Sequence, residues 1–350
     1  MLDRRSEPYG FGYTRKDLIL YALAIGMGSE DGSVDDDLRF LYEHHAEFSS
    51  LPVFCLTLTF WANQVVENNN PTSARIPIFP PPLMTRDQLI PKELLLSHDD
   101  VDLSQYPVIH TWQSIVWETN LPIPSQNEDD FIRTFINLQT IAVQPKSVGA
   151  FVTTESQVTA LDPVTKQHTL ICTLQSTALV YGISKDIVSS YNTESIPSTP
   201  FTKNSQWHQD TPPILEWTYP TLPNSALLYR IASGDSNHIH VDHSVSEQMG
   251  SPTKAPLLHG LLSLAIAFRG ILKVVPDADC RIRRLEAQFS QPAFVGDVLL
   301  VRIWRGSEQD QFWFQISNST MGAVLVDGGY AELGEPRPSR TTTTTTRSRL

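Results

Sequence analysis

The chain has 350 residues, 41% of them hydrophobic and 18% charged, which is enough for two packed domains or one large one. Its net charge of −12 argues against a nucleic-acid-binding surface but is compatible with a local basic patch for a polyphosphate ligand. We expect no membrane span, because the apolar runs are too short, and no secretory signal, because the N-terminus lacks an apolar core.

The N-terminal half shows patterns of one helix and several strands. The proline-rich stretch 68–91 predicts a loop. The apolar residues of 110–117 predict a helix, and period-two patterns predict strands near 131–143, 148–161 and 169–182. We therefore expect a helix that is followed by antiparallel strands.

The C-terminal half repeats this order after a linker. Residues 186–224 are rich in Ser, Thr, Asn and Pro, which predicts an extended segment on the surface. Apolar residues at helical spacing predict a helix over 256–273. Strand-like runs separated by turn residues follow near 283–290, 298–304, 311–317 and 323–333. A sheet wrapped around one long helix would bury the apolar face of each.

The segment 229–240 carries the candidate chemistry. It places a carboxylate, an amide and an imidazole, Asp235, Asn237 and His240, within six residues. Gly234 permits a tight turn, so these groups can converge on one volume and polarise a water molecule. The pattern therefore indicates a hydration or dehydration site.

Simpler interpretations exist for each residue alone. Asp235 in a Gly-Asp-Ser-Asn sequence would ordinarily form an Asx-turn or cap a helix. His240 alone would more often be a partly buried structural histidine. The two occur together with His259 and Gly260 downstream, and this combination favours a site.

The motif Tyr, Ser-Gly-Asp-x-Asn-x-x-His and a later His-Gly resembles that of the second-type enoyl-CoA hydratases and the wider MaoC-like dehydratases. His238 stands where that family has proline. Residues 11–26, 37–43 and 48–54 look like the opening of the eukaryotic peroxisomal members. The resemblance spans residues 9–333.

The resemblance implies an α+β double hot-dog fold, in which each of two repeats is a long helix wrapped by an antiparallel sheet. It implies an N-terminal half at 1–185 that accommodates the acyl chain and the linker at 186–224. A catalytic half at 225–335 and a tail at 336–350 follow.

The resemblance also implies roles in hydrating a trans-2-enoyl-CoA to the (3R)-hydroxy product, or in the reverse dehydration, within fatty-acid or specialised metabolism. His240 is expected as base and Asp235 as proton donor, in an order that the sequence leaves open. Asn237 would orient the water, and the Gly260 N–H would stabilise the thioester oxygen.

The substrate is itself a coenzyme A thioester, so we expect no separate cofactor, and we expect no metal. Further residues are expected to bind the substrate. The candidates for substrate or coenzyme A binding are Tyr229, Gly234, His259, Arg283 and Arg284. The two arginines are equally well explained as cations that complement a helix end. His110 and Gln113 match a His-x-x-Gln of the family's N-terminal half, for which we expect a structural or chain-binding role.

Three alternatives stay open. His238, His240, Asp242 and His243 could present metal ligands on one face of a strand. The chain could also be a non-catalytic acyl-CoA-binding module. A third possibility is a hot-dog thioesterase, which directs water to the thioester carbonyl.

The last three residues, Ser348-Arg349-Leu350, are a variant of the Ser-Lys-Leu peroxisomal address. They follow six threonines at 341–346, a composition that buries little apolar surface and predicts an exposed tail. We expect a peroxisomal protein that engages the import receptor. The resemblance also makes a homodimer conceivable.

Overall fold

A computed structural model describes residues 9–29, 34–61, 90, 92–96, 101–125, 131–162, 165–192, 211–248, 251 and 253–337. The loop predicted at 68–91 lies outside the described residues except for Ile90, and so does the tail beyond residue 337. Among the described residues, no helix combines the length and apolar character needed to cross a membrane.

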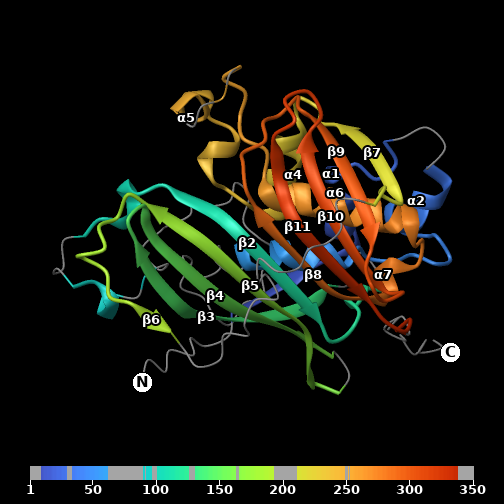
Figure 1. Cartoon of the computed structure of the whole chain (residues 1–350). Helices are drawn as coiled ribbons and strands as arrows, with labels where there is room; N and C mark the ends of the chain where they lie inside the picture. Colours follow the sequence, from blue (N-terminus) through green and yellow to red (C-terminus); the bar gives the residue numbers. More distant parts are fainter. Residues whose placement is uncertain are drawn as a thin grey trace.

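One antiparallel sheet of eleven strands organises the molecule (Figure 1). Its order is β1-β3-β4-β5-β2-β8-β11-β10-β9-β7, and β6 pairs with β3 outside this path. The strands of the N-terminal half are β1 (Tyr9–Tyr13), β2 (Val108–Trp117), β3 (Ile132–Lys146), β4 (Gly149–Leu161), β5 (His168–Tyr181) and β6 (Tyr191–Asn192). Those of the C-terminal half are β7 (Leu215–Pro220), β8 (Ile282–Phe289), β9 (Val298–Arg305), β10 (Gln311–Asn318) and β11 (Val324–Leu333). Because β2 pairs with β8, the two halves meet in one continuous sheet.

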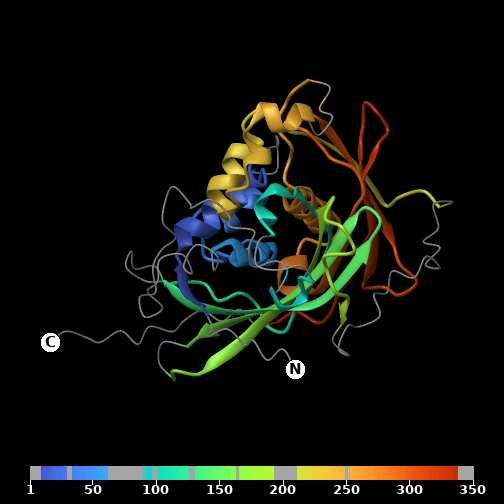
Figure 2. The ribbon, with the colours of Figure 1, turned by 90° about the vertical axis from the view of Figure 1, so that its left-hand side faces the viewer.

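Helices lie on one side of this sheet. The longest described helix, α6 (Gly260–Val274), is enclosed between the C-terminal strands and the helices of the other layer (Figure 2). The remaining helices and helical turns are α1 (Arg15–Ala24), α2 (Val34–Leu41), η1 (Pro52–Thr57), η2 (Lys92–Leu94), η3 (Leu103–Gln105), α4 (Ser225–Ser233), η4 (His238–His240), α5 (His243–Gln248) and α7 (Ala278–Arg281). The sheet that wraps around α6 and continues through the strands of the N-terminal half confirms the double hot-dog arrangement.

The sequence of α6 explains its central place. It is apolar around most of its circumference, and residues 261–271 are all buried. The helix begins after His259, whose backbone is extended, and ends just before Pro276, which cannot continue a helix. Its N-terminus is thereby held at a defined point of the C-terminal half.

Most predicted elements are confirmed, with two corrections. The predicted helix at 110–117 is wrong: these residues form β2, which hydrogen-bonds to β5 on one edge and β8 on the other. The predicted linker 186–224 contains β7, which pairs with β9 along its whole length. The C-terminal half therefore begins with β7, before residue 225. In both cases pairing with distant strands decides the structure, and local composition does not report it.

Candidate active site

The turn after α4 positions the candidate carboxylate. Gly234 ends the helix in the left-handed conformation, at φ 75°, which a side chain would disfavour. Asp235 Oδ1 then accepts a hydrogen bond from the Asn237 N–H at 3.0 Å. This is the Asx-turn that the sequence offered as the simpler interpretation. It occupies only one carboxylate oxygen, so Oδ2 is left to face the interior.

Asn237 shapes the same turn. Its Oδ1 accepts from the Ile239 N–H at 3.4 Å, which caps the short η4 that carries His240. The side-chain oxygen is therefore used by the backbone, and the predicted water-orienting role would have to use the amide N–H groups. His238, in the family's proline position, is exposed.

His240 is held in one tautomer. Its Nδ1 lies 2.9 Å from the carbonyl oxygen of Leu257, and a carbonyl can only accept, so Nδ1 donates. In the neutral ring the lone pair is then on Nε2, which lies 3.7 Å from Asp235 Oδ2. This separation is too long for a direct hydrogen bond and too short for a water to lie between the atoms, but a water to one side of the pair can contact both.

Burial keeps His240 in its neutral form. The side chain is almost enclosed, and this desolvation lowers its pKa below the ordinary value, against the opposing effects of Asp235 and Leu257. A neutral imidazole whose unprotonated Nε2 lies close to the Asp235 carboxyl group is suited to accept a proton from water.

His259 lies behind His240 and not in a solvent-facing pocket. Its side chain is only 1% exposed. The two imidazole rings stack with centroids 3.6 Å apart and planes inclined by 19°. Burial, then the proximity of His240 and Arg230, hold the pKa of His259 well below its usual range. A neutral ring in this position fixes the plane of His240, whereas a substrate-binding role for His259 remains a prediction.

Tyr229 extends this stack. It is fully buried, and its ring centroid lies 4.8 Å from that of His259 and 5.9 Å from that of Tyr21 on α1. The structure therefore brings Tyr229, Gly234, Asp235 and His240 together around His259. Within this group Tyr229 is a packing residue of the interior.

Gly260 provides a backbone donor beside these side chains. It is the first residue of α6, where the N–H groups have no partner within the helix and the helix dipole favours negative charge. A Cβ at this position would come within 3.2 Å of Phe289. Glycine therefore lets the helix N-terminus pack closely against β8.

Arg283 and Arg284 are not brought to this group. They lie near the start of β8, about 20 Å from Phe289 at the other end of the strand at the usual rise per residue. Arg283 donates to the carbonyl oxygens of Arg281 and Glu335, and Arg284 pairs with Glu286. Their assignment to coenzyme A remains a prediction.

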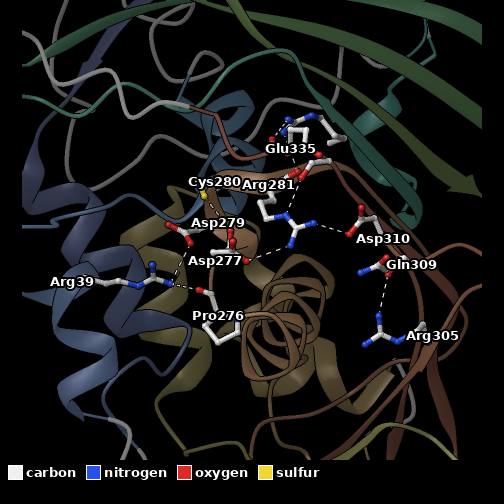
Figure 3. A network of polar contacts seen from close by, with 12 residues as sticks. Arg39, Pro276, Asp277, Asp279, Cys280, Arg281, Arg305, Gln309, Asp310 and Glu335 are labelled. Atoms are coloured by element: carbon white, nitrogen blue, oxygen red, sulfur yellow. Dashed lines mark hydrogen bonds and ion pairs between the residues drawn. The ribbon is translucent and has the colours of Figure 1, made fainter.

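A polar network surrounds this distant end (Figure 3). Arg281 lies between Asp310, at 2.6 Å, and Asp277, at 3.6 Å. Arg39 of α2 reaches the buried Asp279 of α7 at 3.1 Å and so ties the N-terminal half to the short helix that follows α6. These contacts give the basic residues of the region structural partners.

The geometry does not favour the metal-binding alternative. His238 and His243 are exposed, and His243 Nδ1 contacts the Lys254 carbonyl. A different set, Asp235, His240 and His259, offers ligand atoms within 4.8 Å of one another. The rings, however, stack in nearly parallel planes with centroids 3.6 Å apart, so lone pairs that lie in those two planes do not meet at one ion.

The sequence interpretation missed the place of Phe289. Its ring packs at Gly260 and lies 4.8 Å from the ring of His110 on β2. The N-terminal half therefore reaches the N-terminus of α6 through β2. This contact depends on the pairing of β2 with β8, and no local sequence motif predicts it.

Comparisons with known proteins agree with these two halves. Residues 204–327 match the family described as MaoC like domain, and residues 11–81 match the MFE-2 hydratase 2 N-terminal domain. The first match begins before residue 225, as the position of β7 requires.

Two curated relatives cover nearly the whole chain. The chain is 27% identical to the peroxisomal multifunctional enzyme type 2 of Drosophila melanogaster over 92% of the chain's own length. It spans only 46% of the length of that enzyme. It is 24% identical to the probable enoyl-CoA hydratase 2 of Dictyostelium discoideum, over 95% of this chain and 94% of that protein.

A solved structure supports the fold. The MaoC-like dehydratase from Phytophthora capsici superposes with a TM-score of 0.65, at 23% identity, over 95% of this chain and 96% of that one. At this identity the likeness supports the double hot-dog fold and no more.

Proposed function

Because the chain carries a MaoC-like domain and an MFE-2 hydratase 2 N-terminal domain, we propose that it adds water reversibly to a trans-2-enoyl-CoA and yields the (3R)-3-hydroxyacyl-CoA. The observation that carries the proposal is the 3.7 Å gap between His240 Nε2 and Asp235 Oδ2. The two atoms are close enough for one water, placed to one side of the pair, to hydrogen-bond to both. The Dictyostelium relative bears the name of this activity.

The reaction uses the pair as base and acid. His240 Nε2 accepts a proton from the water while the water oxygen bonds to C3 of the substrate. The electron pair of the C2–C3 double bond moves toward the thioester and leaves negative charge on its oxygen. Asp235, which enters this step in its protonated form, donates that proton to C2, and the proton that His240 took from the water then returns to Asp235 and restores both groups.

Backbone polarity stabilises the charged intermediate. The thioester oxygen becomes enolate-like when C3 is attacked, and a fixed N–H donor lowers the energy of that state most. The Gly260 N–H lies at the N-terminus of α6, where the helix dipole adds to its effect. The low pKa of His240 keeps the base neutral and ready in the same enclosure.

The proposal requires no cofactor and no metal ion, because a neutral imidazole and a carboxyl group supply every proton that moves. Dialysis against a chelator should leave the rate unchanged, and added zinc should not raise it. A rate that falls on chelation and recovers with one divalent ion would contradict this part of the proposal.

We assign the protein to the peroxisome, supported by the Drosophila relative's name and by Ser348-Arg349-Leu350. A fluorescent fusion at the N-terminus should be imported, and removal of the last three residues should leave it in the cytosol. We also propose a homodimer, which light scattering of the purified protein can test.

The direct test is incubation with a medium-chain trans-2-enoyl-CoA. We expect loss of the enoyl thioester absorbance and formation of the (3R) enantiomer, identified by chiral chromatography. Release of free coenzyme A thiol without hydration would favour the thioesterase. Binding without turnover of any chain length would favour the non-catalytic module.

A further inference from the structure

A continuous wall leads from the N-terminus of α6 into the N-terminal half. Phe289 packs at Gly260, and its ring centroid lies 4.8 Å from that of His110. His110 Nε2 in turn lies 3.0 Å from Ser176 Oγ on β5. His110 and Ser176 therefore lie on the face of the sheet that α6 covers, which is the concave face.

A row of hydroxyl groups continues from Ser176 across this face. Ser176 is directly opposite Thr154 on β4, and Thr154 is directly opposite Thr140 on β3. Residues paired in this way point to the same side of an antiparallel sheet. Three hydroxyls and one imidazole thus form a band across β3, β4, β5 and β2, which we call the polar band. Each of its four side chains is only partly buried.

The surroundings of the polar band are mainly apolar. The next row on one side consists of Val143, Val152 and Ala178. On the other side Leu138 and Leu174 flank the buried Ser156. An alkyl chain that lay across this face would contact apolar side chains except at the polar band. An unsubstituted chain has no group that can hydrogen-bond to the band.

The hydrogen bonds show what the band can offer. Burial lowers the pKa of His110 to about 4, so its ring is neutral at physiological pH. His110 Nε2 lies 3.0 Å from the Trp112 carbonyl and must carry the proton that it donates there. Ser176 Oγ can then only accept from that N–H, and its own proton is left for another acceptor. No residue of the band carries a charge, so a carboxylate would have no cation here.

We propose that the acyl group of the substrate carries a neutral oxygen function, a hydroxyl or keto group, beyond C3, and that Thr154, Ser176 and His110 bind it. This rests on the proposed function, because it requires the acyl chain to extend from the reacting carbons beside Asp235 along the concave face of the N-terminal half. It narrows the substrate from enoyl-CoA esters in general to those with an oxygenated chain. Direct or water-mediated hydrogen bonds to the band would favour this chain over a plain one.

The opposite face of the same strands supplies a matched control. Thr153 and Thr177 lie one residue from Thr154 and Ser176, and their hydroxyls contact each other at 2.9 Å. Alternation along a strand places this pair on the outer face. Thr154→Val and Thr177→Val each remove one hydroxyl from neighbouring strands, but only the first alters the band.

The experiment measures binding of saturated medium-chain acyl-CoAs by calorimetry, with a hydroxyl group moved one carbon at a time beyond C3. We expect the best-placed hydroxyl to tighten binding about fivefold over the unsubstituted chain. Thr154→Val and Ser176→Ala should each reduce this preference to about one to two, whereas Thr177→Val should retain it. Thermal unfolding of each variant checks that it is folded.

Two results would overturn the proposal: tighter binding of the plain chain at every hydroxyl position, or an equal loss of preference in Thr177→Val. Turnover separates this inference from the one on which it rests. Selective binding of the hydroxylated chain by a protein that hydrates no enoyl-CoA would support the band and refute the hydratase. Hydration with no preference for oxygen would do the reverse.

Discussion

The two halves of the molecule share a backbone plan but not a chemistry. Their strands follow mirror order about the pairing of β2 with β8, so β1 corresponds to β7 and β3 to β9. Tyr21 on α1 and Tyr229 on α4 each precede a glycine by five residues. Both glycines, Gly26 and Gly234, have positive φ, at 87° and 75°. The next residue is Met27 in one half and Asp235 in the other.

The same divergence appears at the start of the buried helix. Leu51 precedes η1 with φ −72° and ψ 119°, and His259 precedes α6 with φ −65° and ψ 131°. The backbones match, but an aliphatic side chain stands where the other half has an imidazole. The comparison teaches that the hot-dog backbone alone does not supply the site. Asp235 and His240, the proposed acid and base, lie in one half, and the concave face of the other half carries the polar band that we propose binds the acyl chain.

The sharpest way to break the comparison is to remove the acid or the base. Asp235→Asn and His240→Gln should each lower kcat/KM about a hundredfold to ten-thousandfold, because proton transfer to or from the water is lost. Asn at 235 keeps the oxygen that accepts from the Asn237 N–H, so the turn should persist. Steady-state hydration of an enoyl-CoA measures the effect.

The control is the corresponding position of the other half. Met27→Leu conserves volume at a buried site and should change kcat/KM less than about twofold. A Met27→Leu protein as impaired as Asp235→Asn, with both still folded, would mean that the two halves share the catalysis.

A smaller effect should follow from Gly260→Ala. The new Cβ would lie 3.2 Å from Phe289, so the helix N-terminus or the ring must shift by a few tenths of an ångström. We expect kcat to fall about tenfold through misplacement of the N–H donor. The double variant with Phe289→Leu should recover part of the loss, whereas Pro52→Ala in the other half should leave kcat unchanged.

The smallest effect concerns pH and stability. The pKa of His110 is lowered to about 4, and those of His240 and His259 are also lowered. As pH falls below about 6.5, these histidines become protonated in the unfolded chain but stay neutral in the folded protein, so the free energy of unfolding falls. Each histidine contributes a slope of up to about 1.4 kcal/mol per pH unit until its folded pKa is reached.

Denaturant unfolding from about pH 7 to about pH 5 measures this slope. His259→Gln and His110→Gln should each flatten it, one in the catalytic half and one in the other. Subtracting each variant's curve from that of the wild type isolates the one histidine. Identical slopes in wild type and both variants would show that these rings titrate normally.

Much of this architecture could be predicted from local sequence. The strands β3 to β5 and β8 to β11 follow their period-two patterns, and α6 follows its apolar repeat. β2 could not be identified in this way, because its ten residues become a strand only between β5 and β8. β7 was hidden for the same reason in a segment with the composition of a linker.

The sequence by itself determined that Asp235, Asn237 and His240 lie close together, because all three fall within the six residues, 235–240, that follow the turn at Gly234. Only the tertiary structure decided that His240 is neutral and carries its proton on Nδ1, because folding buries the ring and places the Leu257 carbonyl beside Nδ1. It also decided that His259 stacks behind His240 and that His110 reaches Phe289. Short-range geometry is written in neighbouring residues, whereas desolvation and cross-strand contact depend on segments far apart in the chain.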